Sequence, residues 1–268
     1  MGKEVVVIKK RQRTHKFIFS KGLDRLLIER DIFTKLTTRE NRFVHGKDPM
    51  FVNSTVAIEP FSIFVKGTHL HTMGAFSYSR SNLPVDTIVG RYSSIAPGVS
   101  RMGPNHPMDR FTTSQITYET KNISLNTYKE KWTNQFEPSP NQLRRQPIDI
   151  GNDVWIGENV TFSSKGIKVH DGAVIAAHAI VTKDVPPYAI VAGCPAKIIN
   201  FRFSPECIQQ MLQLKWWQYD FGQFSTIRGD ESIEDFISKV KQLIDQQQVK
   251  PFAPTVTMID DFLKAAEE

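Results

Sequence analysis

The chain has 268 residues, of which 40% are hydrophobic and 23% are charged, so it is long enough for one large domain with a sizeable core. Its two cysteines, Cys194 and Cys207, exclude a disulfide framework and a CxxC zinc site, which predicts a reducing compartment, the cytoplasm. The formal net charge is +6, and no recognisable nucleic-acid-binding fold accompanies it, so we expect no nucleic-acid partner.

Residues 1–50 read as an N-terminal extension that carries a basic cluster and no export or membrane signal. The apolar run from Val5 to Ile8 is too short for a signal peptide, and no stretch reaches the roughly 18 apolar residues that span a bilayer. A mixed apolar pattern predicts one helix near Leu23–Phe33. The basic residues are interpreted as a solvated surface that favours an anionic cosubstrate: Lys9, Lys10, Arg11, Arg13 and Lys16.

A six-residue period dominates residues 51–203. An aliphatic or aromatic residue returns at every sixth position, as in Ile150, Ile156 and Phe162, and again in Val169, Ile175 and Val181. This period fits neither an α-helix, with about 3.6 residues per turn, nor a lone strand, with a period of about 2. It predicts a coil of triangular turns with one short strand per side, in which the periodic side chains fill the interior. We therefore expect one β-helix domain over residues 51–203.

Two interruptions break the six-residue period. The segment Ser-Asn-Leu-Pro-Val-Asp at residues 81–86 is typical of an inserted turn. A much longer insertion covers residues 101–147 and contains His106 between Pro104 and Pro107. Whether this insertion holds a helix is left open. Because loops of this length in compact domains are usually functional, we expect it to carry part of the active site.

Residues 204–268 show helical patterns. Ser204 and Pro205 are typical of a helix start, and apolar spacing predicts a second helix over Glu231–Gln246. A third, short helix is expected over Val256–Ala266. The adjacent Trp216 and Trp217 are expected to pack the first of these helices onto the coil or onto a neighbouring subunit.

Six motifs carry a resemblance to a known family: Val89-Gly-Arg-Tyr-Ser-Ser-Ile-Ala-Pro-Gly-Val99, Asn105-His106-Pro-Met-Asp109, Ile150-Gly-Asn-Asp-Val-Trp-Ile-Gly157, Val181-Thr-Lys-Asp-Val-Pro-Pro-Tyr-Ala-Ile-Val191, Gly193-Cys-Pro-Ala-Lys197 and Leu214-Lys-Trp-Trp217. With them the chain resembles the hexapeptide-repeat acyltransferases over about residues 50–220. The Asn-His-x-Met-Asp stretch and the Trp-Trp pair resemble motifs of a narrower group, the xenobiotic acetyltransferases. That group includes chloramphenicol and streptogramin O-acetyltransferases and relatives that acetylate sugars.

The resemblance implies an all-β fold, a left-handed parallel β-helix of hexapeptide repeats with C-terminal α-helices and an inserted active-site loop. It also implies a homotrimer with active sites between subunits, acetyl-CoA as cosubstrate and no metal. The positions that match the family's cofactor contacts are Ala176, Ala177, Thr182, Lys183 and Lys197. The chain departs from the family at residues 162–169, which are one residue longer than a hexad, so we expect a bulged corner there.

His106 is the candidate for the catalytic base. Acetyl transfer to a hydroxyl needs a group that accepts the hydroxyl proton, and a neutral histidine suits this task because its ordinary pKa, about 6.5, is near working pH. His106 lies in the long insertion, and the family's catalytic histidine falls on this position. The alternative is an exposed loop histidine without a catalytic role. The nearby Asn105, Asp109 and Trp132 are candidates for binding the acceptor.

Other chemistry-bearing residues receive weaker roles. His170 and His178 fall at corners of the coil, where side chains point outward. His69 and His71 alternate, but a zinc site would need a third converging histidine, so no metal is expected. Cys194 stands where the family commonly has asparagine and has no evident paired base, which argues against an acyl-enzyme.

The predicted function is acetyl-CoA-dependent O-acetylation of a small-molecule or sugar hydroxyl. The extensions at both termini favour a sugar destined for a surface polysaccharide, and an antibiotic such as chloramphenicol or a streptogramin is the second hypothesis. Fold and base are shared by all of these enzymes, so the sequence does not name the acceptor. The alternative of another class is a non-catalytic trimeric β-helix scaffold, which would neither bind CoA nor transfer acetyl groups.

Overall fold

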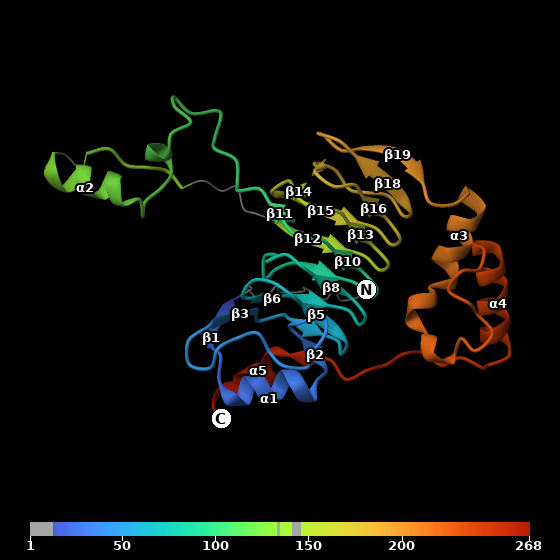
Figure 1. Cartoon of the computed structure of the whole chain (residues 1–268). Coiled ribbons are helices and arrows are strands. Elements are labelled where there is room, and N and C mark those ends of the chain that lie inside the picture. The colour runs from blue at the N-terminus through green and yellow to red at the C-terminus, as the bar shows by residue number, and fades with distance from the viewer. Residues whose placement is uncertain (1–12, 133–134, 141–145) are drawn as a thin grey trace, which may run out of the picture.

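The computed structural model describes residues 13–132, 135–140 and 146–268. They contain a left-handed parallel β-helix of about seven turns, with α-helices at its base and beside it and one long inserted loop (Figure 1). The residues that return at every sixth position fill the interior: Ile150, Ile156 and Phe162 are at most 1% exposed. The predicted fold class is confirmed, and the stacking of successive turns supplies the core.

Strands on three faces build the coil. The first face holds seven parallel strands and one antiparallel strand that closes them: β2 (Ile32–Phe33), β5 (Ser62–Phe64), β8 (Tyr78–Ser79), β10 (Ser94–Ile95), β13 (Trp155–Ile156), β16 (Val174–Ile175), β18 (Ala189–Ala192) and the antiparallel β19 (Lys197–Phe201). The second face holds five parallel strands and a terminal antiparallel one: β4 (Ala57–Ile58), β7 (Thr72–Met73), β9 (Ile88–Val89), β12 (Gln146–Ile150), β15 (Lys165–Val169) and the antiparallel β20 (Thr257–Met258).

The third face is divided into two sheets. The lower sheet contains β1 (Thr14–Ile18), which is antiparallel to β3 (Pro49–Asn53), and β6 (His69–Leu70). The upper sheet contains β11 (Ser100–Arg101), β14 (Thr161–Phe162) and β17 (Ile180–Val181). Equivalent residues of successive turns lie above one another, so Ser100, Thr161 and Ile180 form one column on this upper sheet.

Both ends of the chain cover the base of the coil. Helix α1 (Lys21–Glu29) is capped by Ser20, whose Oγ accepts a hydrogen bond from the Leu23 amide. It packs against α5 (Ile259–Ala266), and Arg30 of the first segment pairs with Asp261 of the last at 3.0 Å. The buried side chains of the two helices join the core of the coil: Leu23, Leu26, Leu27, Phe262 and Ala265. The apolar end of the solenoid is thereby shielded from water.

The start of the chain differs from its prediction. The helix expected near Leu23–Phe33 ends at Glu29, and Ile32–Phe33 form β2, because Asp31 adopts a left-handed backbone with φ of 51° that stops the helix. Within the basic cluster, Arg13 and Lys16 are exposed. Lys9, Lys10 and Arg11 lie outside the described residues.

Beside the coil, the C-terminal region forms a small helical layer. It contains α3 (Pro205–Leu214), η2 (Trp216–Gln218), η3 (Phe221–Gln223) and α4 (Ile233–Asp245). The predicted cap is confirmed, since Ser204 Oγ accepts from the Cys207 amide. The third predicted helix begins later than Val256, because Thr257–Met258 pair with β4 as β20. No helix in the described segments is long and apolar enough to cross a membrane.

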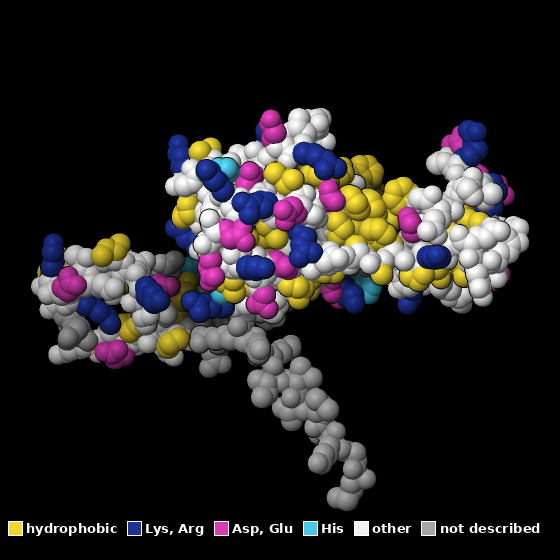
Figure 2. Space-filling view, turned by 90° about the horizontal axis from the view of Figure 1, so that it is seen from below, with side chains coloured by type: hydrophobic (Ala, Val, Ile, Leu, Met, Phe, Trp, Pro, Cys, Tyr) yellow, Lys and Arg dark blue, Asp and Glu magenta, His cyan; other side chains and the backbone are white. Residues whose placement is uncertain are grey.

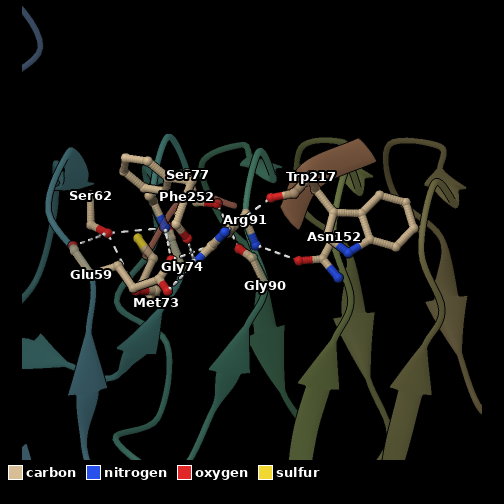
Figure 3. Close-up of polar contacts among 11 residues, drawn as sticks. Glu59, Ser62, Met73, Gly74, Ser77, Gly90, Arg91, Asn152, Trp217 and Phe252 are labelled. Carbon is tan, nitrogen blue, oxygen red and sulfur yellow. Dashed lines mark hydrogen bonds and ion pairs between the residues drawn. The ribbon is translucent and has the colours of Figure 1, made fainter. Parts of the chain in front are cut away.

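Arg91 joins this C-terminal segment to the middle of the coil (Figure 3). Its guanidinium donates two 2.7 Å hydrogen bonds to the carboxylate of Glu59, two turns below. It also donates to the carbonyl oxygens of Trp217 at 3.1 Å and of Phe252 at 3.0 Å. The side chains of Arg91 and Glu59 are 16% and 17% exposed. This bidentate ion pair is therefore partly buried, where it is stronger than a pair on the surface.

A ladder of aromatic rings lies at the same corner of the coil. Phe61, Phe76 and Tyr92 occupy three successive corners with φ between 61° and 64°, and their rings stack 5.2 Å apart. Phe252 packs on Phe76, and Trp216 packs on Tyr92 with ring centroids 4.6 Å apart. Left-handed corners usually favour glycine or asparagine, so the stacking of these rings offsets the backbone cost of their φ angles.

The longer turn at residues 162–169 is accommodated within a strand. The corner residues Ser163 and Ser164 are buried, and β15 then runs for five residues beside β12. Gly166 adopts a φ of +82°, and a Cβ there would lie 2.6 Å from the Cβ of Gln146. Gly166 therefore accommodates the extra residue within β15, whereas the sequence predicted a bulged corner.

His71 is a titratable group inside the coil. Its side chain is 1% exposed, its Nδ1 lies 3.0 Å from the carbonyl oxygen of Thr72, and its Nε2 has no hydrogen-bond partner among the described residues. Burial lowers the pKa of His71 to about 4. The described segments contain no group of three or more His, Cys, Asp or Glu side chains that could hold a metal ion.

We expect His71 to make the protein sensitive to mild acid. Between its ordinary pKa, about 6.5, and its folded pKa of about 4, the unfolded chain binds a proton that the folded chain does not. The free energy of unfolding should therefore fall by about 3 kcal/mol as the pH is lowered through this window, and the contribution is fully present above it. Urea unfolding of the wild type and of His71→Phe at several pH values measures this, and equal pH slopes in the two proteins would contradict it.

Candidate active site

The long loop leaves and re-enters the coil at neighbouring points. It departs after β11 on the third face and returns at β12 on the second face. The guanidinium of Arg101, which is 6% exposed, donates to Asp86 Oδ2 at 3.0 Å and to the carbonyl oxygen of Gln146 at 2.7 Å. Arg101 therefore connects the first residue of the loop to the residues at its end.

The described part of the loop has its own local structure and projects away from the coil (Figure 1). It contains η1 (Gln115–Thr117), capped by Ser114, and α2 (Ile123–Lys131), capped by Asn122. Arg110 joins its two arms, because one guanidinium nitrogen donates to the carbonyl oxygens of Thr117 at 2.5 Å and Ser139 at 2.7 Å. The insertion therefore does contain a helix, α2, which the sequence had left open.

His106 lies on this loop with one ring nitrogen engaged and the ring exposed. Its Nδ1 lies 2.6 Å from the carbonyl oxygen of Thr113 and 3.1 Å from the hydroxyl of Tyr118. A carbonyl oxygen can only accept, so we assign the proton of the neutral ring to Nδ1. The lone pair then lies on Nε2, which is the arrangement that a general base requires.

The candidate acceptor residues lie on the same loop at two places. Asn105 and Asp109 are exposed and flank His106 in the chain. Trp132 lies directly after α2, is 72% exposed and stacks on Tyr128 with centroids 5.5 Å apart. Within the described residues, His106 contacts Thr113 and Tyr118 and not Trp132, so the single chain does not bring these two candidate residues together.

The candidate cofactor residues surround the upper sheet of the third face. Ala176 and Ala177 form the corner between β16 and β17, and Thr182 and Lys183 follow β17 directly. Lys197 begins β19, next to Ala196, whose amide donates to the carbonyl oxygen of Ile180. Both lysines are exposed, and neither forms an ion pair with a described residue. These positions therefore flank the face from which the loop of His106 departs.

The corner at Ala177 is closely packed against the turn below. A Cβ at Gly157 would lie 2.6 Å from the amide nitrogen of Ala177, so only glycine permits this spacing. Cys194 is exposed and free, and its peptide bond to Pro195 is cis. His170 and His178 lie at corners of the coil, as the sequence predicts, and His178 has a φ of 61°.

Sequence reasoning missed the residues that position His106. Tyr118 follows it by twelve positions and Thr113 by seven, in a stretch without periodicity, and Thr113 acts through its backbone carbonyl. Arg101 and Arg110 were also missed, because their partners are mostly backbone oxygens far along the chain. A cluster of polar residues around a candidate base was the only signal, and it did not indicate which of them make contact.

Comparisons with known proteins place the chain in a family, although no family model matches it. It is 37% identical over 159 residues to a probable macrolide acetyltransferase of Lysinibacillus sphaericus, which covers 57% of this chain and 82% of that protein. It is 35% identical over 187 residues to virginiamycin A acetyltransferase of Staphylococcus aureus, and this alignment covers 69% of this chain and 80% of that protein. Among solved structures, a galactoside acetyltransferase in complex with coenzyme A aligns with a TM-score of 0.34 and 25% identity, over 57% of this chain and 70% of that one. On the identity and coverage of the first two relatives, the chain belongs to the hexapeptide-repeat acetyltransferases, in the xenobiotic acetyltransferase group.

Proposed function

We propose that this protein transfers an acetyl group from acetyl-CoA directly to an acceptor hydroxyl, with His106 as the general base. The observation that carries this proposal is the contact between His106 Nδ1 and the Thr113 carbonyl oxygen, which leaves Nε2 as the basic nitrogen. Exposure of the ring on a projecting loop suits a residue that acts on a substrate held outside its own coil.

The reaction follows from these groups. His106 Nε2 accepts the proton of the acceptor hydroxyl while its oxygen attacks the thioester carbonyl, which forms a C–O bond and a tetrahedral oxyanion. Backbone N–H groups at coil corners are suited to stabilise that oxyanion. The oxyanion then collapses, the C–S bond breaks, and the imidazolium returns its proton to the leaving sulfur. The products are the acetyl ester and free CoA, and His106 is neutral again.

We propose that acetyl-CoA lies along the upper sheet of the third face. Small side chains at Ala176 and Ala177 leave room for the pantetheine arm beside backbone amides, and Thr182 adds a hydroxyl. Lys183 and Lys197 offer positive charge for the phosphates, and neither is paired with a carboxylate among the described residues. No residue in this group requires a metal.

Lys183→Ala and Lys197→Ala are expected to raise the KM for acetyl-CoA several-fold, with smaller effects on kcat. This pattern is the signature of lost ground-state binding. Steady-state kinetics with varied acetyl-CoA measures it, and Lys168→Ala is the matched control because Lys168 is an equally exposed lysine on the second face. Normal affinity for acetyl-CoA in both variants would remove these lysines from the binding groove.

We further propose that the working unit is a homotrimer in the cytoplasm, in which the loop of one subunit reaches the coil of another. The loop exposes large apolar side chains that its own coil does not cover: Met108 at 84%, Phe111 at 78%, Ile123 at 79% and Trp132 at 72%. Several exposed apolar side chains on one projecting segment are typical of a surface that packs against another chain. Two free cysteines agree with a reducing compartment.

The acceptor proposed first is an antibiotic-like molecule that carries a hydroxyl on a largely apolar body. Two relatives are named for a macrolide and for virginiamycin A. The loop also contains a cavity of about 670 Å³ whose lining combines apolar side chains, among them Ile116, Leu125 and Phe136, with polar ones such as Glu119 and Lys129. Pockets of this size and character hold drug-sized ligands.

A sugar hydroxyl, as in a surface polysaccharide, is the second candidate. The stacked rings of Tyr128 and Trp132 offer an exposed aromatic face of the kind that packs on a sugar ring. Of the described parts of the terminal extensions, which favoured this hypothesis in the sequence, α1 and α5 lie at the base of the coil and α3 and α4 lie beside it, so none lies at the loop (Figure 1).

An acetylation panel separates these candidates. Purified protein with acetyl-CoA is offered chloramphenicol, a macrolide, virginiamycin and simple galactosides, and CoA release and the mass of the product are measured. We expect acceptor-dependent CoA release and a product heavier by one acetyl group for an antibiotic. Transfer to the galactosides alone would favour the sugar hypothesis. No CoA binding and no transfer to any acceptor would favour a non-catalytic scaffold.

A further inference from the structure

The contacts of His106 hold its ring within the loop rather than against the coil. Both neighbours of its Nδ1, the carbonyl oxygen of Thr113 and the hydroxyl of Tyr118, belong to the loop itself. The described part of the loop forms a lobe beside the coil in both views of the whole molecule (Figure 1, Figure 2). The position of His106 relative to the coil therefore depends on the contacts that hold the two arms of the loop, the outgoing arm that begins at Arg101 and the return arm that ends at Gln146.

Arg101 holds the two arms together where they meet the coil. It is the last residue of β11, and its Nη1 donates at 2.7 Å to the carbonyl oxygen of Gln146, the first residue of β12. The same nitrogen donates to Asp86 Oδ2 at 3.0 Å, and the side chain of Arg101 is 6% exposed. A buried contact between charged groups is stronger than one on the surface. Arg101 therefore joins both ends of the loop to one carboxylate of the coil.

That carboxylate belongs to the inserted turn at residues 81–86, which interrupts the six-residue period. The other end of this turn contacts the segment that leads into the loop. Ser81 is 5% exposed, and its Oγ donates to the carbonyl oxygen of Ala96 at 2.7 Å and accepts from the amide of Val99 at 2.9 Å. Val99 directly precedes β11. The inserted turn therefore supports the root of the loop at both of its own ends.

Arg110 joins the two arms at a second place. Its Nη1 donates to the carbonyl oxygens of Thr117 at 2.5 Å and of Ser139 at 2.7 Å. The amide of Ser139 also donates to the Thr117 carbonyl oxygen, at 2.9 Å. Thr117 directly precedes Tyr118, whose hydroxyl lies 3.1 Å from His106 Nδ1. Arg110 therefore connects the return arm to the segment that contacts the ring of His106.

We propose that Arg101 and Arg110 are positioning residues for His106, with Asp86 of the inserted turn as the anchor of Arg101. This inference rests on the proposed function, in which His106 of one subunit acts on acetyl-CoA held by another coil. The two arginines lie on either side of His106 in the chain and join the same two arms, so together they restrict where the ring can lie. A displacement of about 1 Å can cost a factor of about 100 in rate. Arg101 is too buried to serve as a phosphate ligand.

Removing either guanidinium is expected to lower kcat about 10- to 100-fold while the affinity for acetyl-CoA stays unchanged. The variants are Arg101→Met and Arg110→Met. CoA release, with the acceptor found in the panel and with water, measures kcat, and calorimetric titration measures the affinity for acetyl-CoA. In each arginine a single nitrogen donates both hydrogen bonds. Arg101→Lys and Arg110→Lys keep one donating nitrogen, so they should recover most of the lost turnover.

Arg202 supplies a matched control. Its Nη1 donates to Asp153 Oδ2 at 2.8 Å and to the carbonyl oxygen of Gly172 at 2.9 Å, the same two kinds of contact that Arg101 makes, and neither partner belongs to the loop. Arg202→Met should therefore keep the wild-type kcat.

A second variant addresses the charge that Arg101→Met leaves without its partner. Arg101→Met combined with Asp86→Asn removes the carboxylate charge and should lower kcat as Arg101→Met does. Thermal unfolding of each variant shows whether the proteins that are compared are folded.

A double-mutant cycle separates positioning of His106 from a general effect on the fold. Added to His106→Ala, neither Arg101→Met nor Arg110→Met should lower the residual rate further, because no base remains to be positioned. An additional loss as large as in the wild-type background would overturn the proposal. So would wild-type kcat in both methionine variants, or a raised KM for acetyl-CoA with unchanged kcat. In these cases low turnover in His106→Ala would still support the proposed function, whereas near-wild-type turnover in His106→Ala would overturn both.

Discussion

Replacing His106 with alanine is expected to lower kcat by at least about 100-fold, because a general base typically contributes a factor of about 10²–10⁴. Affinity for acetyl-CoA and the oligomeric state should not change, since the ring is exposed and the proposed cofactor residues lie on the coil. Steady-state acetylation of the acceptor found in the panel measures kcat, and calorimetric titration with acetyl-CoA measures the affinity.

Two further variants make this test specific. His170→Ala removes a corner histidine that no proposed step uses, so it should keep wild-type turnover. Tyr118→Phe removes the hydroxyl 3.1 Å from His106 Nδ1 but leaves the Thr113 carbonyl in place, so its effect on kcat should be much smaller. Near-wild-type turnover in His106→Ala would exclude His106 from the mechanism.

Replacing residues 122–132 by a Gly-Ser linker of equal length is expected to abolish acetylation of the acceptor while acetyl-CoA still binds. This segment contains α2 and Trp132, with the exposed aromatic rings and part of the apolar cavity. It leaves His106, Thr113 and Tyr118 in place, so slow transfer of the acetyl group to water should continue. Product formation by mass spectrometry and CoA release without acceptor measure the two activities separately.

The control for this replacement is a change on the same helix that keeps its fold. Glu130→Ala with Lys131→Ala alters two exposed charges and should keep acceptor use. A longer replacement of residues 115–137 also removes Tyr118 and the Thr117 carbonyl that Arg110 contacts, so transfer to water should fall as well. Full acceptor use by the 122–132 variant would mean that specificity lies elsewhere.

The coil could be predicted from the sequence because its core repeats. Each turn buries residues such as Ile150, Ile156 and Phe162 at equivalent positions, and a period of six fits neither a helix nor an isolated strand. The helix start at Ser204 could be predicted from its local cap, and the second helix could be predicted from its apolar spacing, although its cap at Ser232 was not recognised.

The return of the C-terminus to the base of the coil could not be predicted. It depends on pairs that are far apart in the sequence, such as Arg30 with Asp261 and Thr257 with Ile58. The carbonyl oxygens of Trp217 and Phe252 that Arg91 contacts leave no trace in the side-chain pattern. The same limit applies to the site, where His106 stood out in its motif but its backbone partner at Thr113 did not.

A structure of the protein with coenzyme A would show where His106 Nε2 lies relative to the sulfur. We expect Nε2 of one subunit to lie within hydrogen-bond reach of the thiol, directly or through one water, with the arm of CoA along β11, β14 and β17 of a neighbouring coil and its phosphates near Lys183 and Lys197. A thiol bound away from His106, with that ring still exposed to solvent, would contradict it.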